Sequence, residues 1–267
     1  MQFIATLLTR LAYIDTPSLA GWLIWVGLAG LLAFLLSNWR KYHSTISQRN
    51  TWVLIALALF TPIATLFLGL EFSSGGALPV PGIPAQAPGS TVMIFSAIPW
   101  TLAGGLFGPF AGAALGMFGG LLRGVWDTHS IFSIVEFGIL GAVFAVDTRQ
   151  RYRTPLYNLL RQPLFNVVFL TLIHALLFIV SAVTTVSASP AERLDYAFSN
   201  LGAASFAFGI EMLIAGFAAQ VISTVFPRLW GGRGALQPSP AEKSIETRFV
   251  SGAGAIISTL LILLLVG

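Results

Sequence analysis

Long apolar runs separated by short polar segments dominate the pattern of hydrophobic and polar positions along the chain. About 20 apolar residues in a helix span the hydrocarbon layer of a bilayer, so runs of this length predict membrane-spanning helices. Transmembrane strands would alternate polar and apolar residues over about ten positions, and these runs do not alternate. Five runs are clear: 18–37, 51–70, 164–186, 198–226 and 249–267.

The segment between 91 and 147 predicts three further, shorter crossings. Gly108-Pro109 separates the first from the second, and the pentapeptide 126–130 is typical of a turn before the third. These crossings are expected at 91–106, 109–126 and 131–147. We therefore expect an all-α polytopic membrane protein with about eight transmembrane helices in a compact bundle, including a glycine-rich helical hairpin.

Basic residues in the connecting segments predict the orientation of these helices, because Lys and Arg concentrate on the cytoplasmic side. If the first crossing ends inside, eleven of the 14 basic residues lie in inside segments. These are Arg40, Lys41, Arg49, Arg149, Arg151, Arg153, Arg161, Arg228, Arg233, Lys243 and Arg248. Arg10 and Arg193 fall outside, and Arg123 lies near the outer end of the fourth helix. The bias predicts a multi-pass protein of the cell membrane with its N-terminus outside.

The segments around the runs complete the expected organisation. Residues 1–17 place apolar side chains at near-helical spacing and predict an amphipathic helix on the outer surface. Residues 18–230 form the membrane bundle, in which the proline-rich stretch 71–90 predicts an extended outer loop. Residues 231–248 are typical of a cytoplasmic linker. Residues 249–267 end inside an apolar run, so we expect a final transmembrane helix that continues into a longer protein.

Composition agrees with a membrane location. Only 9% of the 267 residues are charged and 56% are hydrophobic, with a mean hydropathy of +0.84, whereas about a quarter of the residues of a soluble domain are charged. The net charge of +4 rests on few residues, so we expect no nucleic-acid partner. The lipid bilayer is the expected partner.

The sequence predicts neither an enzyme within these residues nor a metal or cofactor. Cys is absent, which excludes disulfides and thiolate metal sites. The chain contains no phosphate-binding loop of the G-x-x-x-x-G-K form, no H-E-x-x-H motif and no His and carboxylate residues at metal-ligand spacing. Its few Ser, His and Asp residues form no recognisable nucleophilic constellation.

Glycine recurs at every fourth position in the centre of the chain. Small residues at this spacing allow two helix backbones to approach closely in lipid. Packing within the chain is the simpler interpretation, and a thinly covered wall beside a ligand cavity is the functional one. The stripe consists of Gly104, Gly108, Gly112, Gly116, Gly120 and Gly124.

A polar group is expected at the outer end of the fourth and fifth helices. A charge in hydrocarbon costs about 3 kcal/mol on insertion scales, so Arg123 and Glu136, at matching depth, should pair or face a polar cavity. The pair would pin the hairpin; alternatively, both residues line an outward-facing pocket in which Arg123 binds an anionic ligand group. The ligand-binding candidates are Arg123, Trp126, Asp127, His129, Glu136 and Trp100. Trp100 is either a core residue or a pocket wall.

Two ionisable residues are expected deeper in the membrane. His174 and Glu211 lie near the middle of consecutive predicted helices, so they should reach similar depth and could hydrogen-bond. Intramembrane ionisable groups often relay protons or couple ions. His174 and Glu211 are therefore candidates for proton or ion coupling.

Residues 98–145 resemble the membrane domain of LytS-type sensor histidine kinases, the five-transmembrane receptor family. The resemblance rests on the glycine-rich hairpin, on Gly119-Gly120 followed by Arg123, on the short turn 126–130, and on Glu136 followed by glycines. It implies a receptor-like core at about 91–226 and a signal-receiving role, with a kinase as one continuation. Crossings before and after the core depart from the family pattern. The hairpin is also similar, more loosely, to the substrate-binding membrane subunits of energy-coupling-factor transporters.

Three functions remain open on these grounds. The leading hypothesis is a sensory or receptor module of a bacterial signal-transduction protein, which senses a small-molecule ligand or a membrane state from the outer side. The alternatives are a small-molecule transporter, or its substrate-binding subunit, and an assembly subunit whose glycine face packs against a partner. A homodimer is also compatible with the sequence.

Overall fold

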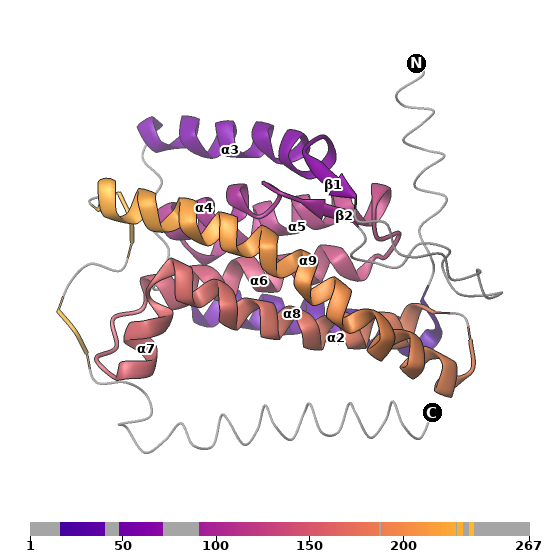
Figure 1. Ribbon diagram of the computed structural model, residues 1–267. Helices are drawn as coiled ribbons and strands as arrows, with labels where there is room; N and C mark the ends of the chain where they lie inside the picture. The colour runs from indigo at the N-terminus through magenta and orange to yellow at the C-terminus, as the bar shows by residue number, and fades with distance from the viewer. Residues whose placement is uncertain are drawn as a thin grey trace.

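The computed structural model describes residues 17–40, 48–71, 91–186, 188–227, 229–231 and 235–237, and most of them are helical (Figure 1). The expected surface helix before residue 17, the loop 72–90, most of the linker 231–248 and the final helix 249–267 lie outside the described residues. The helices are α2 (Leu19–Asn38), α3 (Gln48–Leu66), α4 (Ile98–Phe107), α5 (Pro109–Trp126), α6 (Phe132–Arg149), α7 (Pro155–Leu160), α8 (Pro163–Thr185) and α9 (Pro190–Val225).

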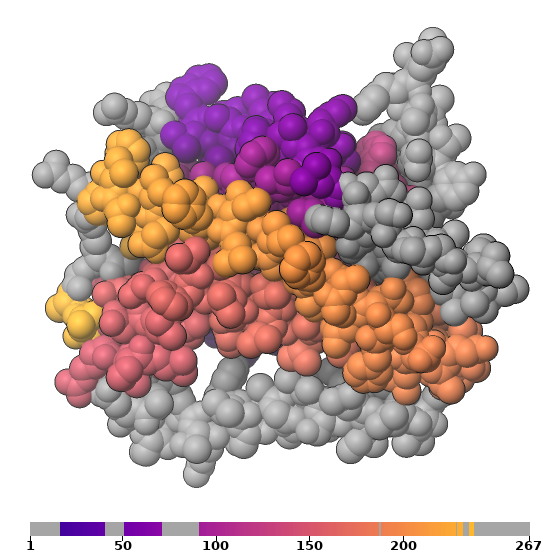
Figure 2. All heavy atoms as spheres, in the orientation of Figure 1, coloured from indigo at the N-terminus to yellow at the C-terminus, as the bar shows by residue number. Residues whose placement is uncertain are grey.

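Three of the described helices are long and apolar enough to cross a membrane: α2, α8 and α9. Large apolar side chains on their outer faces are exposed, among them Leu172 at 63% and Phe217 at 64%. Figure 2 shows the side of the molecule on which α9 crosses obliquely between α3 and α8. An aqueous surface would not favour so many exposed apolar groups, so the arrangement fits a membrane location.

The third predicted crossing, 91–106, is wrong as a single helix. Residues Thr91–Met93 form a strand, β2, that pairs in antiparallel fashion with β1 (Gly69–Glu71). The helix α4 begins only at Ile98 and has ten residues, which corresponds to about 15 Å of the roughly 30 Å hydrocarbon layer. The strand pair also shortens the second run, since α3 ends at Leu66.

The last described helix begins earlier than its apolar run predicts. Helix α9 starts at Pro190 rather than at 198 and has 36 residues. Ser189 and Glu192 form a capping box, in which the Ser189 backbone N–H donates to the Glu192 carboxylate at 2.9 Å. This cap satisfies backbone groups at the helix start and accounts for the additional two turns.

The two predicted breaks of the hairpin are confirmed. Gly108 has a φ of 106° and separates α4 from α5, which begins with Pro109. A positive φ of this size favours glycine. Helix α5 ends at Trp126 and α6 begins at Phe132, with His129 at φ 50° in the turn between them.

The glycine stripe packs α5 against α6 with almost no side-chain layer between the backbones. A Cβ atom at Gly116 would overlap the carbonyl oxygen of Phe137, and one at Gly120 would overlap that of Ser133. A Cβ at Gly112 would lie 2.6 Å from the Gly141 carbonyl oxygen. Packing within the chain therefore explains the stripe, as the simpler interpretation holds.

The bundle has two ends, which we name after charged residues. At the Arg123 end α5 stops, α6 starts and α8 stops, as shown by the 3.3 Å contact of the Ser130 and Ser181 hydroxyls. At the Arg149 end α6 stops, α8 starts and α9 stops. The short helix α4 runs from the level of Arg123 to the Arg149 end, where its residue Gly105 accepts a hydrogen bond from Arg149 at 2.9 Å.

Candidate functional site

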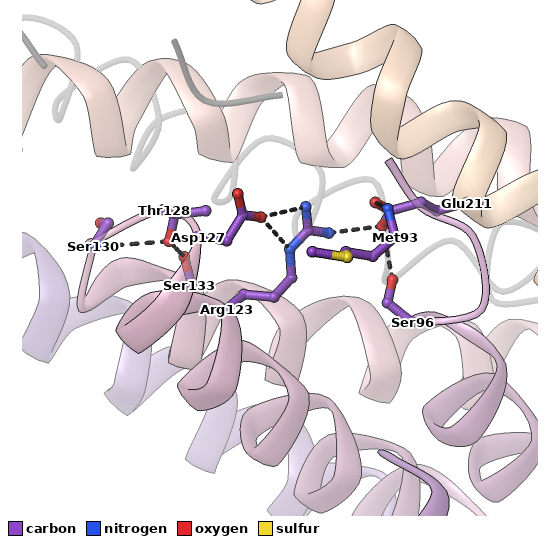
Figure 3. Close-up of polar contacts among 8 residues, drawn as sticks. All are labelled: Met93, Ser96, Arg123, Asp127, Thr128, Ser130, Ser133 and Glu211. Atoms are coloured by element: carbon purple, nitrogen blue, oxygen red, sulfur yellow. Dashed lines mark hydrogen bonds and ion pairs between the residues drawn. The ribbon is translucent and has the colours of Figure 1, made fainter. Parts of the chain in front are cut away.

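Arg123, in the last turn of α5, lies between two carboxylates (Figure 3). Its Nη1 donates to Oε2 of Glu211 in α9 at 2.7 Å. On the other side, its Nε and Nη2 donate to Oδ2 of Asp127 at 3.1 and 2.9 Å. The Glu211 side chain is completely buried, whereas 15% of the Asp127 side chain is exposed. The guanidinium thus joins a core carboxylate to a more accessible one.

Glu211 receives two further hydrogen bonds from the segment that precedes α4. The backbone N–H of Met93 donates to Glu211 Oε1 at 2.7 Å, and the Ser96 hydroxyl donates to Oε2 at 2.8 Å. Both oxygens of this buried carboxylate are therefore satisfied, as buried charges require. The strand β2 contributes to the site by presenting the N–H of its last residue.

Glu136 and His174 face each other close to this ion pair. Oε1 of Glu136, in α6, lies 3.4 Å from Nδ1 of His174, in α8. Within the described residues neither of these two atoms has a hydrogen-bond partner. The imidazole packs against the ring of Phe208, at a centroid distance of 3.9 Å. The two atoms are close, but their geometry does not form a hydrogen bond.

Two aromatic rings connect the halves of the site. The Arg123 guanidinium carbon lies 5.3 Å from the centroid of the Phe137 ring, and this ring makes an edge contact with Phe208 at 5.9 Å. Both rings belong to the hydrophobic core of the bundle. The charged cluster, as we name it, comprises Arg123, Asp127, Glu136, His174 and Glu211, and it draws on helices α5, α6, α8 and α9.

The structure exchanges the partners that the sequence predicts. One interpretation of the sequence pairs Arg123 with Glu136, and His174 and Glu211 are expected at a depth where they could hydrogen-bond. In the structure Arg123 binds Glu211 and His174 faces Glu136. The early start of α9 and its oblique course across the bundle explain the difference (Figure 1). They place Glu211 level with the last turn of α5.

That Arg123 binds an anionic ligand group stays a prediction, because its guanidinium already has two partners in the structure. Asp127 and Glu211 occupy its guanidinium from two sides, so an anion reaches it only by displacing one of them. Three carboxyl groups and one guanidinium make the cluster richer in acidic groups than in basic ones. Asp127 is the partner that a ligand from the Arg123 end meets first, because Glu211 is fully buried.

The other predicted site residues lie beside the cluster. Trp126 and His129 are half-buried in and after the last turn of α5, and the His129 Nδ1 atom has no hydrogen-bond partner among the described residues. Trp100 is fully buried and packs edge-on against Phe137 and Phe144. Trp100 is therefore a core residue rather than a pocket wall.

Sequence reasoning missed several polar residues that organise the site. Ser96 binds Glu211, and a chain of hydroxyl groups braces the turn, where Thr128 and Ser133 hydrogen-bond at 2.7 Å (Figure 3). Ser130 continues this chain to Ser181 in α8. The available signal was a hydroxyl inside or beside an apolar run, which is too common in membrane helices to single out a site.

Within the described residues, no group of three or more His, Cys, Asp or Glu side chains has a geometry that could hold a metal ion. Comparisons of the chain with protein-family models, with curated proteins and with solved structures find no match.

Proposed function

We propose that this chain is a membrane-embedded sensory module, and that the charged cluster is the element that responds to the signal. The observation that carries the proposal is the position of Arg123, whose guanidinium bridges a buried and a partly exposed carboxylate. The bridge joins α5 to α9, so a change of partner at Arg123 alters how the two helices are held together.

A ligand at the Arg123 end acts on this bridge by competition. A small molecule with a carboxylate or phosphate group can take the place of Asp127, since Arg binds such groups in a bidentate manner. Glu211 keeps its bonds from Met93 and Ser96 during the exchange. A ligand shifts an equilibrium only if it binds one of the two states more tightly. Here the ligand binds the state in which Asp127 has released Arg123 more tightly than the state in which Asp127 occupies it.

We further propose that the whole chain forms about eight crossings in the cell membrane, with the N-terminus outside. Three described helices are suited to span a bilayer, and the distribution of basic residues supports the orientation. In this topology the Arg123 end faces outward. The resemblance of residues 98–145 to the LytS-type receptor domain favours a signal-receiving role.

Ligand screening by thermal stability tests the proposal. The purified chain is screened in detergent against small carboxylates and phosphates, and a saturable rise in melting temperature is expected. Asp127→Asn should raise the apparent affinity for the anionic ligand at least several-fold, because it removes the carboxylate that competes for Arg123. Arg193→Gln, at the start of α9 near the same end, is the matched control and should leave affinity unchanged. An equal response of both variants, or no saturable ligand, contradicts the proposal.

A transporter is the second candidate, and the Glu136–His174 pair favours it. Two ionisable groups that face each other at 3.4 Å in the core suit proton coupling. Proton-driven uptake into proteoliposomes that is abolished by Glu136→Gln would support this function. The assembly-subunit hypothesis gains no support from the glycine stripe, because the stripe packs within the chain.

A further inference from the structure

A cavity of about 550 Å³ opens at the Arg149 end, away from the charged cluster. Its volume lies in the range of small-molecule sites, which is roughly 300–1,000 Å³. The wall is formed by the end of α6, the start of α8, the end of α9 and the segment after α9. The residues that matter for its chemistry are Thr148, Arg161, Gln162, Gln220, Ser223 and Trp230.

The polar groups of the wall suit a ligand with one negative charge. Among the described residues of the lining Arg161 is the charged one and none is acidic, and Arg161 makes no ion pair with another described residue. Oε1 of Gln220 is buried and lacks a hydrogen-bond partner within the described part of the chain. A buried polar atom without a partner is costly, and a hydrogen-bond donor on a ligand would satisfy it.

Two lining hydroxyls have already used their hydrogens. The Thr148 hydroxyl donates to the Phe144 carbonyl oxygen at 2.8 Å, and the Ser223 hydroxyl donates to the Gln220 carbonyl oxygen at 2.8 Å. Both hydroxyl oxygens can therefore still accept hydrogen bonds. The lining combines one cation with amide donors and several acceptors, which matches a phosphate group attached to a hydroxyl-bearing moiety such as glycerol.

The position of the cavity gives such a ligand access from the membrane surface. The neighbouring helix α7 is short and exposes Leu156 at 61% and Leu159 at 43%, which is typical of a helix at the membrane interface. Arg149, Arg151 and Arg153 lie in the same region of the chain. Basic pockets between membrane helices on the cytoplasmic side bind anionic lipid headgroups.

We propose that this cavity binds the phosphate group of an anionic, hydroxyl-bearing ligand. The Arg161 guanidinium contacts the phosphate, while Gln162 and Gln220 bind the hydroxyl groups. Two sources share this chemistry: a membrane lipid with a phosphoglycerol headgroup and a soluble phosphate ester. The proposal does not depend on the function of the charged cluster.

A ligand in the cavity would contact the segment that follows α9. Trp230 and Gly231, which follow α9, belong to the wall. The Gly231 backbone N–H donates to the Gly105 carbonyl oxygen at 3.0 Å, and Arg149 donates to the same oxygen at 2.9 Å. A ligand in the cavity therefore packs against the junction between the bundle and the residues after 231.

Titration of the purified chain with three compounds tests the site. Short-chain phosphatidylglycerol, short-chain phosphatidylcholine and glycerol 3-phosphate are added in detergent, and the melting temperature gives the apparent affinity. We expect phosphatidylglycerol to bind and phosphatidylcholine, whose choline cation would face Arg161, to bind much more weakly. Arg161→Gln should weaken binding about tenfold, as expected for the loss of a charged hydrogen bond.

Two further variants make the result specific. Arg40→Gln removes an exposed arginine near the end of α2 and should leave affinity unchanged, whereas Gln220→Leu should weaken binding and leave the melting temperature of the unliganded chain nearly unchanged. If glycerol 3-phosphate binds as well as phosphatidylglycerol, the proposed phosphate site is supported and its ligand is a soluble phosphate ester. Equal binding of both lipids, equal losses in Arg40→Gln and Arg161→Gln, or no binding overturns the proposal.

Discussion

Arg123 and Glu211 form a buried ion pair over 2.7 Å, although 88 residues separate them in the sequence. The pair links two antiparallel helix pairs, α5–α6 and α8–α9, which also meet through apolar side chains and through the contact of Glu136 with His174. Met93 and Ser96 attach the segment before α4 to the same carboxylate. The Glu211 carboxylate thus connects three parts of the fold.

Breaking this contact should destabilise the protein strongly. Arg123→Gln leaves the Glu211 carboxylate buried without a countercharge, and the expected loss of unfolding free energy is about 3–5 kcal/mol. Unfolding in detergent, followed by tryptophan fluorescence, measures the loss. In a double-mutant cycle, Glu211→Gln should show coupling to Arg123→Gln, with the double variant much less destabilised than the sum of the two single variants. Coupling that is larger between Arg123 and Glu136 would contradict the observed pairing.

The glycine stripe predicts a difference between two chemically identical substitutions. Gly116→Ala places a methyl group against the carbonyl oxygen of Phe137, while Gly27→Ala in α2 meets nothing within 4 Å. Gly116→Ala should cost about 1–3 kcal/mol, as overpacked cores do. Gly27→Ala should be neutral or slightly stabilising, because alanine is the better helix former. Melting temperatures of the two variants in the same detergent check the contrast, and similar values would refute the close approach of α5 and α6.

The sequence predicts the helices of this fold better than it predicts the site. Apolar runs and the Gly108-Pro109 break locate α2, α5, α6 and α8 within about two residues, because burial in lipid imposes a simple hydrophobic pattern. The strand at 91–93 escapes prediction, since its pairing with residues 69–71 depends on a contact between distant segments. Periodicity within one segment carries no information about such pairing.

The charged residues of the site are predictable as individuals but not as partners. Arg123, Glu136, His174 and Glu211 stand out because charges are rare in apolar runs. Their pairing depends on the tilt of α9, which comes from side-chain packing along its 36 residues. A depth count that assumes parallel, upright helices therefore pairs Glu211 with the wrong residue.

The proposed orientation predicts accessibility from opposite sides of the membrane. The chain contains no cysteine, so single cysteines can be labelled without background. Ala191→Cys, in the first turn of α9, should react with a membrane-impermeant maleimide in intact cells. Asn158→Cys, in α7, should react only after permeabilisation, because α8 lies between the two positions. Labelling of both from one side would refute a crossing by α8.

The junction after α9 should loosen when Gly105 is replaced. A Cβ at this position would overlap the Trp230 ring, so Gly105→Ala should displace the ring and weaken the hydrogen bond from Gly231 to the Gly105 carbonyl oxygen. Hydrogen exchange of the amides at 229–231 is expected to rise at least tenfold.

Gly202→Ala provides the matched control for this measurement. A Cβ at Gly202, in α9, has open space around it, and exchange at 229–231 should remain at the level of the unmodified chain. Unchanged exchange in Gly105→Ala would show that the junction does not depend on α4.

The backbone contact between α5 and α6 also fixes the register of one helix along the other. Carbonyl oxygens of α6 lie against the glycines of α5, and a shift of one helix along the other by a single residue would bring a side chain into that narrow space. The two helices can therefore not slide past each other in small steps. We therefore expect α5 and α6 to move as one unit, so that relative movement of helices takes place at other contacts, such as those that α2, α3, α4, α8 and α9 make with this hairpin.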